Sequence, residues 1–249
     1  MNRAGPPVLA LVLDIEGTTG PLSHVADVLY PYARQRYARW AAAHRDEPVH
    51  REVLGAIAGL TGEEAVDEAR AVAVLEEWTD HDVKTAPLKR VQAMIWARGY
   101  AAGELAGVVY PDVVGVLRRC RAGGVPVHIY SSGAVSAQRD WFAHSDRGDL
   151  TGLIAGYFDL DSAGPKRDPA SYRAITGALR VPAGTVLFAS DVAQELDAAA
   201  EAGWQTLGVR RPGDIRGPGV PGHSTVSALD RLLPDLGSTA AAPAPDPHE

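Results

Sequence analysis

The stretch VLALVLDIEGTTGPL, residues 8–22, decides the fold class of this chain. Its first six residues are apolar, and Asp14, Glu16, Gly17 and two threonines follow almost at once. A short apolar run that ends in a turn signal is typical of a buried strand, so we expect a strand over residues 8–14. Ligands of an open α/β sheet bind beyond the carboxyl ends of its strands, and the two carboxylates therefore indicate a site.

The remaining sequence shows two kinds of pattern. Residues 21–109 have helical spacing throughout, and we find no convincing strand there. From residue 110 onward, predicted helices and strands alternate, which indicates a mainly parallel sheet. We predict helices at 111–121, 134–142, 169–179 and 192–202, and strands at 125–130, 153–157, 186–189 and 204–209.

The predicted fold class is therefore α/β, a Rossmann-like doubly wound parallel sheet with a helical cap inserted after the first strand. We assign residues 1–20 plus 110–236 to the α/β core and residues 21–109 to the helical cap domain. The Ala/Pro-rich tail, residues 237–249, is expected to be disordered.

Composition excludes several classes of protein. The 249 residues carry a net charge of −7, which argues against a general nucleic-acid binder. Cys120 is the only cysteine, so an internal disulfide and a cysteine-rich zinc site are excluded. We find no apolar run long enough to span a membrane and no signal-peptide pattern, and we expect a cytoplasmic enzyme. Of the 24 basic residues only three are lysines, namely Lys84, Lys89 and Lys166.

Two further motifs offer groups that bind phosphate. Ser131, Ser132 and Gly133 directly follow a predicted strand and precede a helix, where hydroxyls and free N–H groups form an anion cradle. Lys166 lies in a loop just before a helix with an Asp-Pro start, and its compact charge suits a phosphate. Taken alone, the serines also fit an ordinary helix cap and the lysine a solvated loop.

A third motif adds a second carboxylate at a strand end. Asp191 follows the predicted strand 186–189, and Glu195 lies about one helical turn later. Glu195 fits equally a first-turn acid that interacts with the helix dipole and a residue that supports the site. Asp14 and Asp191 would repel each other unless a cation lay between them, and Mg²⁺ fits because it prefers carboxylates, water and phosphate oxygens. Together the motifs favour phosphoryl transfer.

The order D-x-E-G-T, S-S-G, K, S-D resembles the phosphatase branch of the haloacid dehalogenase superfamily. The segments DIEGTT, DVLYPYA, IYSSGAVSAQ, GDLTGLIAGYFD and SDVAQELDAAAEAGWQT are similar to the enolase-phosphatases of the methionine salvage pathway. The resemblance covers nearly the whole chain outside the tail, and the DIEGT form is fairly specific to that family.

The resemblance implies a Mg²⁺-dependent acireductone synthase, a phosphoric monoester hydrolase. Its substrate would be a phosphorylated diketone, 2,3-diketo-5-methylthiopentyl 1-phosphate, which is enolised and then dephosphorylated. The metal would be held by the side chains of Asp14 and Asp191 and by the main-chain carbonyl of Glu16. Asp14 would also be the nucleophile, Glu16 the acid and base, and Lys166 a catalytic and phosphate-binding group. Ser131, Ser132 and Gly133 would bind the substrate phosphate, and a monomer is expected from the same resemblance.

Three departures from the family pattern leave substrate choice open. Val108 stands where the resemblance leads us to expect His, Leu160 stands in place of Thr, and the loop before Lys166 is one residue longer. The alternative function is another small-molecule phosphatase or phosphomutase of this superfamily, with a divergent cap. A catalytically inactive binding protein is a third alternative, which the intact Asp14, Glu16 and other site residues argue against. The sequence does not identify the base for enolisation.

Overall fold

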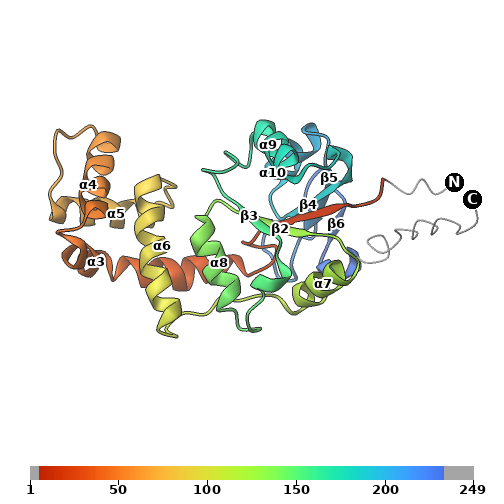
Figure 1. Cartoon of the computed structure of the whole chain (residues 1–249), viewed down its shortest axis with the longest axis horizontal. Helices are drawn as coiled ribbons and strands as arrows, with labels where there is room; N and C mark the ends of the chain where they lie inside the picture. The colour runs from red at the N-terminus through yellow and green to blue at the C-terminus, as the bar shows by residue number, and fades with distance from the viewer. Residues whose placement is uncertain (1–5, 233–249) are drawn as a thin grey trace, which may run out of the picture.

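The computed structural model describes residues 6–232, and their six strands form one sheet (Figure 1). All neighbouring strands are parallel, in the order β3-β2-β1-β4-β5-β6. The chain winds outward in one direction from β1 to β3 and in the other from β4 to β6, so β1 and β4 flank the switch point of a doubly wound sheet. The strands are β1 Ala10–Leu13, β2 Val127–Tyr130, β3 Gly156–Phe158, β4 Val186–Ser190, β5 Gln205–Val209 and β6 Thr225–Val226.

Four longer helices pack around this sheet (Figure 1). Helices α9 and α10 contact each other, and α10 also packs against β4 and β5, whereas α7 contacts β2 and α8 contacts β3. Their bounds are α7 Pro111–Ala122, α8 Val135–Ala143, α9 Pro169–Leu179 and α10 Ala193–Glu201, with short 3₁₀ turns at Thr151–Leu153, Ala183–Thr185 and Leu229–Leu232. These four helices agree with the predicted ones to within two residues at each end.

The segment after β1 is helical, as predicted, and lies beside the sheet as a separate group of helices (Figure 1). We call these helices the cap. They are α1 Leu22–His24, a π-helical turn Val25–Leu29, α2 Tyr30–Arg34, α3 Tyr37–His44, α4 Pro48–Thr61, α5 Glu68–Asp80 and α6 Ala86–Ala101. Helix α6 packs against α8, which joins the cap to the core. The domain boundaries given above remain a prediction.

The first cap helix is locally widened into a π-turn just before Pro31. Proline lacks an N–H group and cannot donate to the preceding turn, so the regular i to i−4 pattern is interrupted there. Val25 and Leu29 of this turn are buried. Single π-turns within helices are frequent at functional sites, and this one lies at the entry from core to cap.

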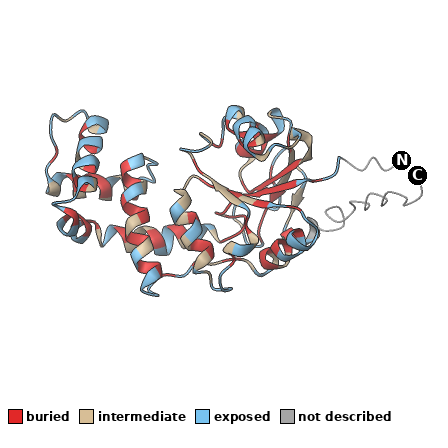
Figure 2. Cartoon of the chain, viewed as in Figure 1, coloured by how far each residue is buried: buried red, intermediate tan, exposed pale blue. Residues whose placement is uncertain are grey.

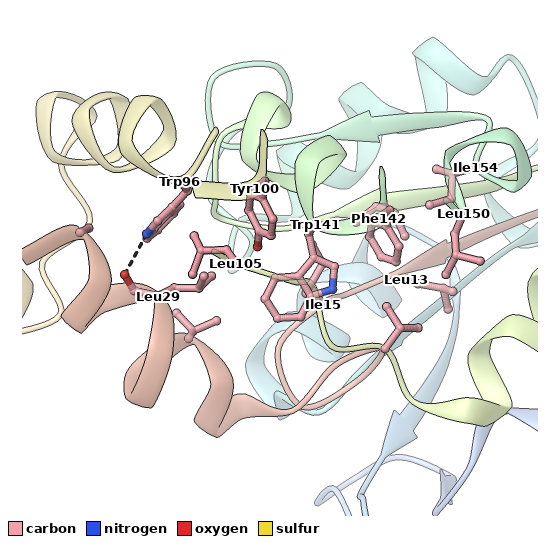
Figure 3. Close-up of a cluster of buried hydrophobic side chains, with 14 of the residues drawn as sticks. Leu13, Ile15, Leu29, Trp96, Tyr100, Leu105, Trp141, Phe142, Leu150 and Ile154 are labelled. Atoms are coloured by element: carbon pink, nitrogen blue, oxygen red, sulfur yellow. Dashed lines mark hydrogen bonds between the residues drawn. The ribbon is translucent and has the colours of Figure 1, made fainter. Parts of the chain in front are cut away.

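Strand β1 is buried on both faces, as expected for a central parallel strand. On one face, Leu11 and Leu13 belong to an apolar cluster that continues into the cap. Figure 2 shows buried residues both in the strands of the sheet and along the cap helices. Figure 3 shows this row from Leu13 and Phe142 through Trp141 to Trp96, whose Nε1 donates to the Leu29 carbonyl at 2.8 Å. Val12 faces the opposite cluster, which is rich in aromatic side chains. The shared core fixes the cap relative to the sheet edge.

The sheet differs from the predicted one in two places. The strand expected at 153–157 begins only at Gly156, because Thr151–Leu153 forms a 3₁₀ turn in which the Leu153 N–H donates to the Leu150 carbonyl. Strand β6 was not predicted, since a two-residue strand leaves too short a pattern to detect. Within residues 6–232, no helix is long and apolar enough to cross a membrane. The predicted tail, 237–249, lies outside the described residues.

Candidate active site

Asp14 lies at the centre of the carboxyl edge of the sheet. Leu13 pairs with Ile129 of β2 on one side and Ala189 of β4 on the other. The Asp14 N–H then donates to the Ala189 carbonyl at 3.0 Å, so its side chain emerges between the ends of two neighbouring strands. Parallel pairing therefore brings together the residues after β1, β2 and β4, as the sequence predicted.

A buried ion-pair cluster forms around Lys166. Its Nζ lies 2.6 Å from Asp14 Oδ1 and 2.6 Å from Glu195 Oε2. The Ser190 hydroxyl donates to the same Glu195 oxygen at 2.9 Å. Lys166, Asp14 and Glu195 are all buried. The two interpretations of Glu195 left open above are thus decided, because its side chain supports the site directly through Lys166.

Electrostatics of this cluster leave an excess of negative charge. Burial raises the pKa of Asp14 well above its ordinary value, although the Lys166 ammonium opposes this shift. Burial alone would lower the pKa of Lys166, but Asp14 and Glu195 outweigh it and raise that pKa, so the lysine stays charged. One ammonium faces the carboxyls of Asp14, Glu195 and Asp191, all of which repel one another. The site therefore favours a further cation.

Asp191 is paired with such a cation, the guanidinium of Arg216. This arginine was not predicted from the sequence. Arg216 Nη2 lies 2.5 Å from Asp191 Oδ2 and 2.6 Å from Asp214 Oδ2, in the loop between β5 and β6. Asp191 also packs against Gly17, whose φ of +72° suits glycine, and a Cβ at that position would overlap the Asp191 carboxylate. Nothing in the sequence around Arg216 indicates this contact, because it depends on how the loop folds back.

The loop that carries Glu16 is fixed by main-chain contacts. The Thr19 hydroxyl donates to the Asp14 carbonyl at 3.0 Å. Arg211, which is buried, donates through Nε to the Thr18 carbonyl at 3.1 Å and pairs through Nη1 with Asp112 at 2.8 Å. The loop is thereby anchored to the segment after β5 and to the start of α7.

The Ser131–Gly133 turn lies where the sequence placed it, between β2 and α8. The Gly133 N–H donates to Ser131 Oγ at 3.3 Å. Gln138 of α8 holds the turn from behind, since its Nε2 donates to the Gly133 carbonyl at 2.7 Å and to the Phe158 carbonyl at 2.9 Å. No hydrogen bond among the described residues joins Ser131 or Ser132 to Lys166, so the turn and the Lys166 loop are each held by contacts of their own.

Two tyrosines hold the Lys166 loop in place. The Tyr130 hydroxyl donates to the Gly164 carbonyl at 2.8 Å, and the Tyr172 hydroxyl donates to the Lys166 carbonyl at 2.7 Å. The Asp168 side chain caps α9 by accepting the Ala170 N–H at 2.8 Å, which confirms the predicted helix start. The ammonium of Lys166 also lies 5.7 Å from the centre of the Tyr130 ring.

A narrow cleft of about 70 Å³ leads from this edge of the sheet into the cap. Glu16 and the Ser131–Gly133 turn line it on the core side. Tyr30, Lys84 and Lys89 line it on the cap side, so every lysine of this sequence lies at the ion-pair cluster or at the cleft. Burial raises the pKa of Glu16, and the Lys84 ammonium opposes this shift. A protonated Glu16 is thereby favoured at higher pH than for an exposed glutamate.

The departures from the family pattern lie at the borders of this site. The Val108 carbonyl approaches Gly20 so closely that a Cβ there would come within 2.5 Å of it. Leu160 lines a second hollow between cap and core, together with Lys89 and Ser132. Neither residue contacts the cluster of Asp14 and Lys166.

The oxygen atoms at the sheet edge are suited to bind a hard divalent cation. Asp14 uses Oδ1 for Lys166, and its Oδ2 accepts no hydrogen bond from the described residues. Likewise no hydrogen bond within residues 6–232 ends on the Glu16 carbonyl oxygen. Two carboxylates and a carbonyl leave room for the water and phosphate ligands that such a cation retains. The same residues contain no compact group of three His, Cys, Asp or Glu side chains, which a closed all-protein site would require.

Comparison with known proteins gives a consistent result. A family model described as haloacid dehalogenase-like hydrolase matches residues 8–203. An Enolase-phosphatase E1 of Frankia alni is 50% identical over 86% of this chain and 91% of its own length. An Enolase-phosphatase E1 of Nocardia farcinica is 46% identical over 92% of this chain and 97% of its own.

A solved structure resembles the present one along most of its length. The UTR4 protein of Saccharomyces cerevisiae superposes with a TM-score of 0.73 at 32% sequence identity, over 89% of this chain and 98% of that one. A cap beside a parallel sheet is therefore an arrangement that this chain shares with a crystallographically determined relative.

Proposed function

This chain belongs to the haloacid dehalogenase-like hydrolases, and we propose on that premise that it is an enolase-phosphatase of methionine salvage. It acts as an acireductone synthase on 2,3-diketo-5-methylthiopentyl 1-phosphate, which it enolises and then dephosphorylates. The observation that carries the proposal is the buried Asp14–Lys166–Glu195 cluster at the carboxyl edge of the sheet, from which the next residues along the chain, Ile15 and Glu16, line a cleft between core and cap.

We assign the phosphate to the core side of the cleft. Lys166 supplies a fixed positive charge, and Ser131, Ser132 and Gly133 supply hydroxyl and N–H donors at the start of α8. These groups come from two separate loops, and both loops are held by hydrogen bonds from behind. Such preorganised donors stabilise the charge of a phosphoryl group in transfer.

Asp14 is the proposed nucleophile. Lys166 holds one of its carboxylate oxygens at 2.6 Å, and this contact orients the other oxygen. The carboxylate attacks phosphorus, a bond forms between Asp14 and the phosphoryl group, and the ester bond to the substrate oxygen breaks. Water then hydrolyses the aspartyl phosphate, which returns Asp14 to its starting form.

Glu16 is the proposed acid and base. Its raised pKa keeps a proton available for the leaving oxygen of the substrate. After that transfer the carboxylate is able to take a proton from the attacking water. Glu16 lines the cleft between the phosphate-binding turn and the cap, which suits a group that acts on the bond between phosphate and carbon chain.

A divalent metal, which we propose to be Mg²⁺, would be held by the Asp14 and Asp191 carboxylates and by the Glu16 carbonyl. When bound, it supplies positive charge that neutralises the phosphate and polarises a substrate oxygen. We further propose a monomer, with residues 1–20 and 110–236 as the catalytic core and residues 21–109 as the cap.

Phosphate release from the diketo phosphate, measured with Mg²⁺ and with a chelator, tests this function. We expect turnover that depends on Mg²⁺ and that exceeds turnover of a panel of sugar phosphates by at least about 100-fold, or about 2.7 kcal/mol. Comparable release from many sugar phosphates would instead indicate a phosphatase or phosphomutase with a different substrate. No Mg²⁺-dependent release from any of them would contradict an enzymatic role.

A further inference from the structure

Asp82 has an unusual backbone conformation at the cap side of the cleft. It lies in the turn between α5 and α6 with a φ of +52°, in the left-handed region. Arg180, at the end of α9, is the other non-glycine residue with positive φ in the described chain. Non-glycine residues adopt this region rarely, although Asp and Asn tolerate it better than most. Here the left-handed residue ends α5, because the Val83 N–H donates to the Trp78 carbonyl at 2.8 Å and the Asp82 N–H donates to the Thr79 carbonyl at 3.2 Å.

The Asp82 carboxylate collects two donors from different parts of the cap. The Tyr30 hydroxyl at the start of α2 donates to Asp82 Oδ1 at 2.8 Å. The Lys84 ammonium lies 2.5 Å from the same oxygen and also contacts the Tyr30 hydroxyl directly. One oxygen of the Asp82 carboxylate therefore holds both groups, and these two groups line the cleft.

Both donors face the cleft opposite the phosphate-binding turn. Tyr30 and Lys84 line it together with Glu16 and Ser131. The Tyr30 ring is also stacked on Trp96, with centroids 6.4 Å apart. A substrate whose phosphate lies against Ser131 and Lys166 therefore extends its carbon chain toward Tyr30 and Lys84.

This arrangement does little for the stability of the fold. The Asp82 side chain is 65% exposed, and exposed ion pairs of this kind contribute little to the free energy of unfolding. The left-handed φ of Asp82 belongs to the helix cap at the end of α5. The role of its side chain therefore rests on its contacts with Tyr30 and Lys84.

We propose that Asp82 is a positioning residue for the carbon-chain end of the substrate. Its carboxylate and the Tyr30 hydroxyl together fix the Lys84 ammonium, so that the remaining N–H of Lys84 meets a carbonyl oxygen of a phosphorylated diketone. The inference rests on the proposed function, because it requires a substrate with polar oxygens beyond the phosphate ester. The groups that hold the phosphate do not depend on Asp82.

The variant Asp82→Asn removes the charge and keeps a residue that tolerates the left-handed turn. Asp82→Gly keeps that backbone conformation and removes the side chain. Asp80→Asn is the matched control, since Asp80 lies two residues away and pairs with Arg34 on the surface. Each variant is assayed on the diketo phosphate and on p-nitrophenyl phosphate, which has no carbonyl chain, and each is checked by thermal unfolding.

We expect Asp82→Asn and Asp82→Gly to lower kcat on the diketo phosphate by about 10-fold or more, because misplaced groups act less well on the reacting chain. Both should keep p-nitrophenyl phosphate hydrolysis and the unfolding temperature close to those of the Asp80→Asn control. Equal losses on the two substrates, or no loss on the diketo phosphate, would overturn the role of Asp82. A wild-type protein that hydrolyses p-nitrophenyl phosphate but not the diketo phosphate would refute the proposed function itself, and this inference with it.

Discussion

The two sides of the cleft carry similar charged pairs in different surroundings. On the core side, the side chains of Lys166 and Asp14 are 8% and 6% exposed. On the cap side, those of Lys84 and Asp82 are 33% and 65% exposed. A buried pair is strongly coupled and leaves a costly unpaired charge if one partner is lost, whereas an exposed pair is weak. Loss of one partner from the charged pair on the core side therefore costs more stability than the same loss on the cap side, where the proposed role of the pair is to orient polar groups at the cleft.

Loss of the core nucleophile should have the largest effect. In Asp14→Asn the carboxylate that we propose to attack phosphorus is gone, while the size of the side chain is kept. We expect phosphate release from the diketo phosphate to fall by at least about 1,000-fold. A steady-state phosphate assay with saturating Mg²⁺ measures this, and turnover near that of the wild type would rule out Asp14 as nucleophile.

Substitution of the lysine on each side of the cleft should lower the free energy of unfolding by different amounts. Lys166→Met leaves Asp14 and Glu195 buried without their shared cation, and we expect a loss of about 3–5 kcal/mol in the free energy of unfolding. Lys84→Met should cost less than about 1 kcal/mol, because its pair is exposed. Urea unfolding of both variants without metal tests the difference. Equal losses would remove the distinction between the two sides.

Much of the core side was predictable from the sequence. Strands β1, β2 and β4 are short apolar runs, and parallel pairing places Asp14, Ser131 and Asp191 at one edge without further information. The cap side was not predictable in the same way. Asp82 and Tyr30 meet only because α2 packs near the turn after α5, and no local pattern encodes that contact. The scarcity of lysine was the one signal for Lys84 and Lys89.

Arg216 illustrates a second limit of the sequence. Its contact with Asp191 crosses from the β5–β6 loop to the end of β4, over a stretch with no regular spacing. Glu195 was partly predictable, since its position in the first turn of α10 was clear, but its pairing with Lys166 depends on tertiary structure. Helix periodicity and strand ends thus located the site, while loop packing completed it.

Removal of Arg216 should change metal binding on the core side. The guanidinium pairs with the Asp191 carboxylate, so its positive charge would oppose binding of a second cation by the same side chain. We expect Arg216→Gln to bind Mg²⁺ about 10-fold more tightly by isothermal titration calorimetry. Arg173→Gln, which removes a surface pair with Glu201, serves as the control. Weaker binding by Arg216→Gln would mean that Arg216 supports the metal ligands instead.

The smallest expected effect is a change in folding stability when Glu16, which lies between the two sides of the cleft, is substituted. Its raised pKa means that the folded protein keeps a proton that the unfolded chain releases, so folding stability falls as pH rises through this range. Glu16→Gln should therefore be more stable than the wild type at pH 7, without metal, and the difference should vanish below the ordinary glutamate pKa. Thermal unfolding across pH measures this, and a difference that grows toward acid pH would contradict it.

The proposed roles of the core side and the cap side of the cleft are tested most directly by recording enolisation and phosphate release in the same reaction. The wild-type protein would be mixed with the diketo phosphate and Mg²⁺, with ultraviolet absorbance and free phosphate followed together. We predict that an enolised species forms and that one phosphate is released for each molecule of it. Phosphate release without any enolised species would contradict the account, because the cap side would then have no part in the chemistry.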